Sequence, residues 1–192
     1  MEIAFRPLRE NDSGTVLTWR NTPDVAAHMY GDHAVSEAEH ASWLAEVLDD
    51  DDRRYWIVLL DEEPVGLANL VGIDRHNRRA DWGFYLGEAT ARGSGVGRAA
   101  LYLVIEQAFG TLGLHRLTCS ALVGNEAAWG LYESMGFVGE GRLRDHVWKG
   151  GQFHDVLNFA LLADEWAAAR PGVEAKLRAA GIDPAALEVR EG

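Results

Sequence analysis

Three glycines within five positions mark the part of this sequence whose residue types point most directly to chemistry. Residues 92–97 read RGSGVG and lead at once into the apolar run RAALYLVIEQAF. Glycine is the costliest ordinary residue to order in a folded chain, so such a run indicates a place where side chains would be an obstruction. Bare backbone amides at the start of a helix can bind a phosphate group. The segment therefore predicts either an anion-binding loop or a plain tight turn.

Two common phosphate-binding patterns do not fit this loop. A dinucleotide-binding loop has the spacing G-x-G-x-x-G, whereas the spacing here is G-x-G-x-G. A P-loop needs Gly-Lys followed by Ser or Thr, and the sequence here is GVGR. A phosphate site of another kind remains the better interpretation, because the loop joins an expected strand to an expected helix.

A second segment, NEAAWGLYESMGF (125–137), favours a functional role for the glycine loop over a plain turn. Together the two resemble the GCN5-related N-acetyltransferase (GNAT) superfamily. The loop pattern of that family, Gln/Arg-x-x-Gly-x-Gly/Ala, is met by residues 92–97. Its Asn-x-x-Ala…Tyr-x-x-x-Gly-Phe segment is met by Asn125, Ala128, Tyr132, Gly136 and Phe137. The resemblance covers about residues 3–163.

The resemblance implies acetyl-CoA as cosubstrate and no metal. The amides of the glycine loop would hold the pyrophosphate, with Arg92 and Arg98 adding charge-assisted bonds. The pantetheine arm would lie in a gap between two splayed strands. The resemblance thus assigns to cofactor binding Phe84, Tyr85, Leu86, Arg92, Gly93, Gly95, Val96, Gly97, Arg98, Asn125, Ala128 and Tyr132.

The implied reaction is direct acetyl transfer from a thioester to an amine. It needs a neutral amine, a polarised carbonyl and a proton for the departing thiolate. Tyr132 occupies the position of the family's general acid, although a plain core tyrosine is the alternative. A backbone amide near Tyr85 or Leu86 would polarise the carbonyl. Asp81 is the expected base, directly or through water, and its alternative role is that of an exposed strand residue. Glu88 is a weaker candidate.

The segments WRN (19–21), MYGDH (29–33), WGFYL (82–86) and LRDHVWKGGQFHDV (143–156) are similar to a narrower group. These are the nucleotide-sugar acetyltransferases of pseudaminic acid biosynthesis, which acetylate the 4-amine of a UDP-linked 4-amino-4,6-dideoxy sugar. A UDP-amino sugar is then the expected acceptor. The predicted substrate-binding residues are Arg20, Asn21, Tyr30, His33, Trp82, His146 and His154. We expect Trp19 to serve packing instead.

Two other acceptors and one non-enzymatic role stay open. The late segment from Gly139 onwards also resembles spermidine acetyltransferases and ribosomal-protein N-terminal acetyltransferases. An acidic chain attracts a polycation, which favours a polyamine on bulk charge alone. A coenzyme A-binding sensor without turnover is the third possibility, and Tyr132 argues against it. A homodimer is among the expected states.

Composition limits the class of protein. The 192 residues carry a net charge of −12, which argues against a general nucleic-acid binder and against binding to anionic membranes. The one cysteine, Cys119, is expected to be a buried strand thiol. We expect the run DDDD (49–52) to be a solvated helix exit rather than a metal site. The N-terminus lacks the pattern of a signal peptide, and no apolar run reaches membrane-spanning length, so we expect a cytoplasmic protein.

The elements that must position these residues follow from periodicity and turn signals. A strand (3–8), a helix through Trp19 and Arg20, a short helix over 21–30, a helix over 36–48, and three antiparallel strands precede the glycine loop and its helix. A strand, a helix from 125 and a hairpin turning at KGGQ follow. This order predicts an α/β (α+β) GNAT fold with a mixed, mostly antiparallel sheet and helices on both faces. The resemblance adds a splay between the fourth and fifth strands. Residues 1–163 form the expected catalytic domain, and 164–192 a peripheral helix, interrupted at RPG, with a loose end.

Overall fold

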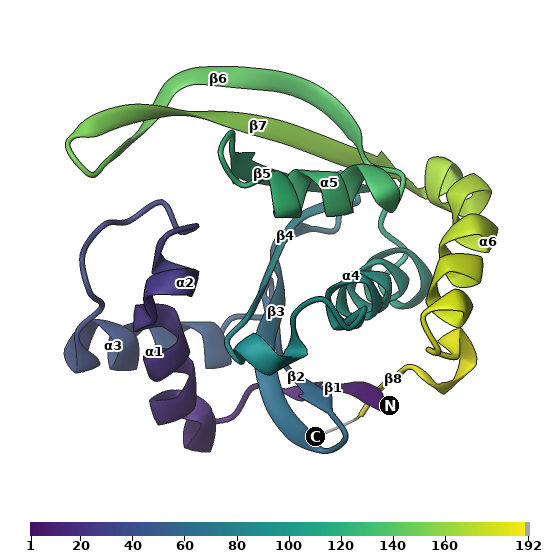
Figure 1. Cartoon of the computed structure of the whole chain (residues 1–192), viewed down its shortest axis with the longest axis horizontal. Helices are drawn as coiled ribbons and strands as arrows, with labels where there is room; N and C mark the ends of the chain where they lie inside the picture. The colour runs from purple at the N-terminus through teal and green to yellow at the C-terminus, as the bar shows by residue number, and fades with distance from the viewer. Residues whose placement is uncertain (191–192) are drawn as a thin grey trace.

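The computed structural model describes residues 1–190 and consists of one mixed sheet with helices on both faces (Figure 1). The strands are β1 (Ile3–Pro7), β2 (Arg54–Leu60), β3 (Glu63–Asp74), β4 (Arg79–Leu86), β5 (Arg116–Leu122), β6 (Val138–Lys149), β7 (Gln152–Leu162) and β8 (Glu188–Val189). The α-helices are α1 (Ser13–Asn21), α2 (Pro23–Ala26), α3 (Glu37–Leu48), α4 (Val96–Glu106), α5 (Glu126–Ser134) and α6 (Ala163–Ala179). Short 3₁₀ turns lie at Glu10–Asp12, Ala89–Ala91 and Pro184–Ala186, and a π-helical turn, Gln107–Thr111, extends α4. The expected fold class is confirmed.

The strands are ordered β6-β7-β5-β4-β3-β2-β1-β8. Neighbours pair antiparallel except for β4 with β5 and β1 with β8, which are parallel. The predicted hairpin between β6 and β7 turns at Gly150 and Gly151, whose φ angles of 58° and 78° suit glycine.

The predicted splay lies between β4 and β5. The two strands pair only from Arg79 with Arg116 to Asp81 with Thr118. Beyond that point β4 continues to Leu86 and β5 to Leu122 without pairing to one another. The side chain of Thr118 donates to the Asp81 carboxylate where the strands part. The divergence opens the middle of the sheet and exposes the β5-facing edge of β4.

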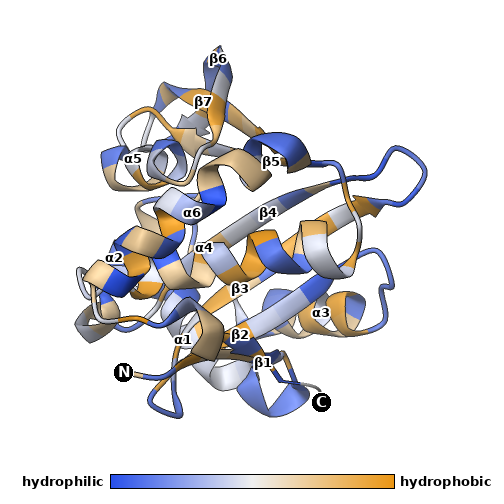
Figure 2. Cartoon of the chain, turned by 90° about the vertical axis from the view of Figure 1, so that its right-hand side faces the viewer, coloured by the Kyte–Doolittle hydropathy of each residue, from blue (hydrophilic) through white to orange (hydrophobic). Residues whose placement is uncertain are grey.

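Alternation along the strands divides the core between the two faces of the sheet. On β2, Trp56 and Val58 face the larger core against α4, while Ile57 and Leu59 face a smaller core under α1 and α3. Helix α4 is buried along almost its whole length because the sheet covers one side and α6 another (Figures 1 and 2). Cys119 is buried in the larger core, as expected.

The sequence predicted the start of helix α3 correctly but not the length of helix α2. Helix α3 starts at the predicted capping box, in which Ser36 and Glu39 bond each other's backbone amides. Helix α2 is expected over much of 21–30 but ends after one turn, at Ala26. The carbonyl groups that follow bond to a distant lysine, described below, instead of continuing the helix.

The C-terminal segment differs from expectation in two ways. Helix α6 runs unbroken through Pro171, which is exposed, because Trp166, Val173 and Leu177 bury the opposite side of the helix in the main core. The expected loose end instead forms β8, which pairs with β1, and the amide of Arg190 donates to the Phe5 carbonyl.

Over residues 1–190, none of the helices combines the length and apolarity that crossing a bilayer requires. The same residues bring no three His, Cys, Asp or Glu side chains together in a way that could hold a metal ion.

Candidate functional site

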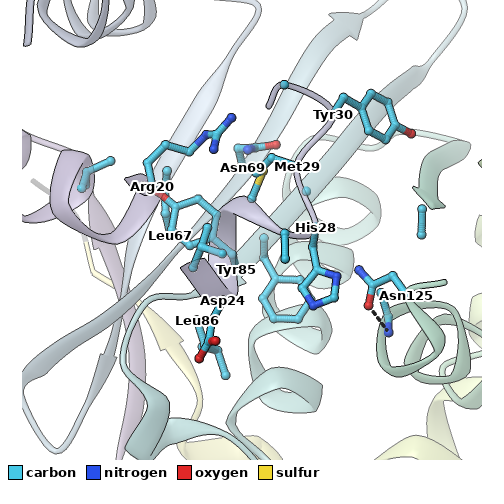
Figure 3. A pocket seen from close by; sticks show the side chains of 18 of the residues that line it. Arg20, Asp24, His28, Met29, Tyr30, Leu67, Asn69, Tyr85, Leu86 and Asn125 are labelled. Carbon is cyan, nitrogen blue, oxygen red and sulfur yellow. Dashed lines mark hydrogen bonds between the residues drawn. The ribbon is translucent and has the colours of Figure 1, made fainter. Parts of the chain in front are cut away.

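A cavity of about 1100 Å³ lies where β4 and β5 diverge. One wall comes from α1, α2 and the loop that follows α2, and the opposite wall from β5 and α5. The diverging part of β4 forms its floor from Trp82 to Leu86. The splay thus produces a deep opening between the two halves of the sheet (Figure 3).

Ten of the residues singled out from the sequence line this cavity. They are Arg20, Tyr30, Trp82, Phe84, Tyr85, Leu86, Arg92, Asn125, Ala128 and Tyr132. They come from α1, the loop after α2, β4, the glycine loop and α5, so the fold gathers residues that lie more than a hundred positions apart in sequence.

Tyr132 lies on α5 at the inner part of the cavity and is 8% exposed. Its ring meets Trp82 edge-on with 5.1 Å between centroids, and Phe159 in the same way at 5.7 Å. Burial raises the pKa of the Tyr132 hydroxyl, so the group keeps its proton at neutral pH. Burial also raises the pKa of nearby Cys119.

Asn125 and the glycine loop form the two helix starts at the cavity. The Asn125 side chain accepts from the amide of Ala128 and caps α5. Gly95 occupies the N-cap position of α4 with φ 91°, and Gly93 has φ 75°, conformations that favour glycine. Both helix starts therefore place backbone amides beside the opening in the sheet.

The reason for glycine differs between Gly95 and Gly97. A Cβ at Gly95 would lie 3.0 Å from Cδ1 of Ile182, so glycine there serves the packing of the C-terminal segment, not only the approach of a phosphate. A Cβ at Gly97 would lie 3.6 Å from the Phe84 ring and 3.8 Å from Leu131, across the opening between β4 and α5. Of the two, Gly97 is the position from which a larger side chain would enter the gap.

The two arginines near the glycine loop, Arg92 and Arg98, differ in whether their guanidinium groups have bonding partners. Arg92 forms an ion pair with Asp24 at 2.7 Å and donates to the Leu86 carbonyl, which ties the loop to α2 and to the end of β4. Arg98, on the first turn of α4, has a buried Nε without a hydrogen-bond partner among the described residues. Val96 is fully buried and anchors the same turn.

Arg20 is the main cation inside the cavity. Its guanidinium forms none of the ion pairs found within residues 1–190. Of the acidic residues that line the cavity, Asp24 is paired with Arg92, and Glu39 bonds both the amide and the hydroxyl of Ser36. These bonds, chiefly the one from the Ser36 amide, lower the pKa of Glu39 to about 2. The lining thus carries two carboxylates, Asp24 and Glu39, and two arginines, Arg20 and Arg92, so its formal charges balance.

Several predicted residues lie outside the cavity. Asp81 lines a separate hollow of about 480 Å³ with Asp50, Asp52 and Arg53. Asn21 bonds the amide and carbonyl of Val35, so it closes the loop between α1 and α3. Three predicted histidines are not in the lining either: His33 bonds Glu39, His146 is exposed on β6, and His154 bonds the Lys149 carbonyl. Five of the residues predicted to bind the cofactor also lie outside the lining, namely Gly93, Gly95, Val96, Gly97 and Arg98.

Trp19 packs as expected. Its ring fills the space beside Gly87, where a Cβ would lie only 2.1 Å away. The indole Nε1 of Trp19 donates to the Glu88 carboxylate at 2.7 Å. Glu88 is the weaker of the two candidates for the base, and this bond already engages its carboxylate. This contact fixes α1 against the end of β4.

Several polar residues that line the cavity were not predicted from the sequence: Asp24, His28, Glu39, His40, Asn69 and Ser120. Figure 3 shows Asn69 and Arg20 on one side of it and His28 and Asn125 further along. Asn69 offered a usable signal, because it is a lone polar residue in the apolar strand run VGLANLVGI. His28 had none, since the sequence pattern predicted a longer helix there.

The site fits a pantetheine thioester on two observations. The β4 edge from Trp82 to Leu86 has no strand partner on its β5 side, so it can bond an extended amide-bearing chain. Asn125, at the start of α5, lines the cavity, and Gly97 on the first turn of α4 lies against Phe84 and Leu131, which also line it; helix starts favour phosphate groups.

Comparison with known proteins agrees with this geometry. Residues 2–138 match the sequence model of the acetyltransferase (GNAT) domain. A Bacillus subtilis protein provisionally named a ribosomal N-acetyltransferase, YdaF, is 35% identical over 57% of this chain and 59% of its own length. Spermidine N(1)-acetyltransferase of Escherichia coli is 25% identical over 86% of this chain and 89% of its own. The acetyltransferase PseH of Campylobacter jejuni is 27% identical over 70% and 82%.

Solved structures show the same fold. The spermidine N-acetyltransferase of Vibrio cholerae, solved with CoA and spermine, superposes with a TM-score of 0.81 at 23% identity. The match covers 86% of this chain and 98% of that one.

Proposed function

The chain belongs to the GNAT acetyltransferase family and is an acetyl-CoA-dependent N-acetyltransferase; we propose that its acceptor is the amine of a small molecule that also carries phosphate. The 4-amine of a UDP-linked 4-amino-4,6-dideoxy sugar is the form that we propose. The observation that carries this proposal is Arg20, an unpaired guanidinium inside the cavity. Guanidinium groups bind phosphate through two parallel hydrogen bonds.

The charges around Arg20 support a phosphate-bearing acceptor. Tyr85 and Arg20 line the same cavity. Burial lowers the pKa of Lys149, and the charge of Arg20 adds to this effect. A polyamine brought here would meet the Arg20 guanidinium, and of the two lining carboxylates Asp24 is already paired with Arg92, while Glu39 keeps its charge. Like charges brought close together disfavour binding. Tyr30, Trp82 and Asn69 would then contact the sugar or base.

Tyr132 is the proposed general acid. Acetyl-CoA supplies the thioester whose carbonyl carbon the acceptor amine attacks. A phenol has an ordinary pKa of about 10 and a thiol of about 8.5, so proton transfer from tyrosine to a thiolate is uphill in water. The surroundings of Tyr132 also disfavour a thiolate, as the raised pKa of Cys119 indicates. Shared burial therefore offsets the weaker acidity of the phenol.

For the base, Asp81 remains our proposal and His28 is its competitor. Asp81 sits at the point where β4 and β5 part but opens into the smaller hollow. His28 lines the main cavity itself. Loss of a general base lowers kcat by about 10²–10⁴. We expect Asp81→Asn to lower kcat by that range and His28→Asn to lower it less than tenfold. The reverse order in steady-state assays would transfer the role to His28.

A polyamine is the second candidate acceptor. Two observations favour it: the net charge of −12, and the E. coli spermidine acetyltransferase, which aligns over more of this chain than PseH does. Bulk charge acts at long range and is screened by salt, whereas Arg20 acts inside the cavity. For this reason we rank the phosphate-bearing amine first. An N-terminal protein acceptor and a non-catalytic CoA sensor rank lower.

Release of free thiol from acetyl-CoA, measured across a panel of UDP-amino sugars, polyamines and peptides, tests this function. We expect turnover with the amino sugar. Arg20→Met should raise the KM for that sugar at least tenfold with little change in the KM for acetyl-CoA. If spermidine alone is acetylated, the acceptor proposal is wrong and the family assignment is untouched. We also propose a homodimer, which sedimentation equilibrium would test.

A further inference from the structure

Lys149, the last residue of β6 before the hairpin turn, reaches across to the end of α2 and the segment after it and bonds three carbonyl groups there. The ammonium Nζ donates to the carbonyl oxygens of Ala26 at 2.6 Å, Ala27 at 2.9 Å and Met29 at 2.5 Å. An ammonium group has three hydrogen-bond donors and no acceptor, so these bonds use its full capacity. The hairpin passes over this segment in Figure 1.

Neighbouring contacts extend this attachment. The amide of Gly150 donates to the Asp32 carboxylate at 3.2 Å. His154 bonds the carbonyl of Lys149 at 3.1 Å and so holds the turn itself. On the other side, the Tyr30 hydroxyl and the Ser120 hydroxyl of β5 are 2.5 Å apart. Segment 26–32 is thus held by residues that follow it in the chain by about ninety positions or more.

The held segment is a wall of the acceptor cavity. Ala27, His28, Met29, Tyr30 and Gly31 all line it. The segment follows the single turn of α2 and pairs with no strand of the described sheet. The amides of Ala27, His28 and Met29 bond carbonyls of the preceding turn, whereas the carbonyls of Ala27 and Met29 find their partner, among the described residues, in Lys149. The shape of this wall therefore depends on the lysine.

We propose that Lys149 is a positioning residue that sets the acceptor-facing wall of the cavity. It acts through His28, Met29 and Tyr30, and it does not contact acetyl-CoA. The inference rests on the proposed function of the cavity as the acceptor site. Burial lowers the pKa of Lys149, which agrees with an ammonium withdrawn from water into the carbonyl groups. Arginine is not an equivalent residue, because its planar fork cannot converge on three oxygens.

Three variants test the proposal. Lys149→Met keeps the length and apolar stem but removes the donors, and Lys149→Arg keeps the charge. Lys176→Met is the matched control, since Lys176 is the only other lysine and donates to a single carbonyl, that of Ser134, away from the cavity. Hydrogen exchange of the free protein is the first readout. We expect Lys149→Met to speed exchange in peptides covering 22–35 at least tenfold, with no change in β2–β4, and Lys176→Met to change neither.

The second readout separates the two substrates. With UDP-4-amino-4,6-dideoxy sugar and with spermidine as acceptor probes, Lys149→Met should raise the acceptor KM at least tenfold. The KM for acetyl-CoA should stay within twofold, and Lys149→Arg should be intermediate. Wild-type exchange over 22–35 in Lys149→Met, or equal changes in both KM values, would overturn the proposal. Should Lys149→Met fail to fold, wild-type exchange in Lys149→Arg would overturn it equally. Because exchange needs no acceptor, failure of the proposed function would show separately, as absence of turnover in the wild type.

Discussion

At the scale of single residues, the Tyr132 hydroxyl differs from that of most buried tyrosines in its hydrogen bonding. It is buried among aromatic rings, yet it borders the cavity, and none of the hydrogen bonds among the described residues involves its hydroxyl. Buried tyrosine hydroxyls usually find a partner in the protein. Tyr102 shows the usual case, because its hydroxyl bonds Glu174 and Arg170.

This contrast gives a matched pair of substitutions. We expect Tyr132→Phe to lower kcat by about 10²–10⁴, because the acid is lost while the ring packing stays. The affinity for acetyl-CoA, measured by calorimetry, should change less than twofold. Tyr102→Phe, an equally buried change on α4, should leave kcat within twofold. A Tyr132→Phe enzyme as fast as the Tyr102→Phe control would remove the phenol from the mechanism.

At the scale of elements, the start of α4 decides whether the gap between β4 and α5 stays open. Gly97 lies on the first turn and points across that gap toward Phe84 and Leu131. Alanine fits there at ordinary contact distance and is favoured over glycine in a helix by about 1 kcal/mol. Leucine would project further, into the space that the splay creates.

We therefore expect Gly97→Leu to raise the dissociation constant for acetyl-CoA at least tenfold without loss of fold, and Gly97→Ala to leave it within threefold. Calorimetry with both variants measures this difference. Gly97 is a sharper test than Gly95, where a side chain would also strain a positive φ and displace Ile182. Unchanged affinity in a folded Gly97→Leu protein would mean that the cofactor does not pass between β4 and α5.

The elements also show what local sequence could predict. The start of α3 was predictable because Ser36 and Glu39 form a capping box within four residues, and the hairpin at Gly150-Gly151 because the turn needs positive φ. The length of α2 was not, since Lys149 lies about 120 residues away from the carbonyl groups that it binds. For the same reason, the cavity residues His28 and Ser120 carried no local signal, whereas Asn125 and the glycine loop did.

At the scale of the whole molecule, the C-terminal segment closes the fold around α4. Ile182 is 1% exposed in the main core, and it packs against Gly95 at the N-cap of α4. Arg190 then bonds Glu2, Glu62 and Glu188 beside β8. A two-residue strand is too short for periodicity to reveal, so the sequence could predict a helix after 163 but not this closure.

The boundary at 163 can be tested through stability. We expect Ile182→Ala to lower the free energy of unfolding by about 2–5 kcal/mol, because it opens a cavity in the core. Arg190→Ala should lower it far less than Ile182→Ala, since the ion pairs of Arg190 are exposed. Denaturant unfolding followed by tryptophan fluorescence measures both. A loss below 1 kcal/mol for Ile182→Ala would mean that residues 164–192 are an appendage rather than part of the domain.

Direct competition between two acceptors tests most plainly whether the enzyme acetylates an amine that carries phosphate. The enzyme is given acetyl-CoA with equal concentrations of UDP-4-amino-4,6-dideoxy sugar and spermidine, and initial product formation is followed by mass spectrometry. Arg20, which forms no ion pair among residues 1–190, and the pairing of Asp24 with Arg92 predict a kcat/KM at least tenfold higher for the sugar. Equal rates, or faster acetylation of spermidine, would contradict the claim and make the polyamine the acceptor.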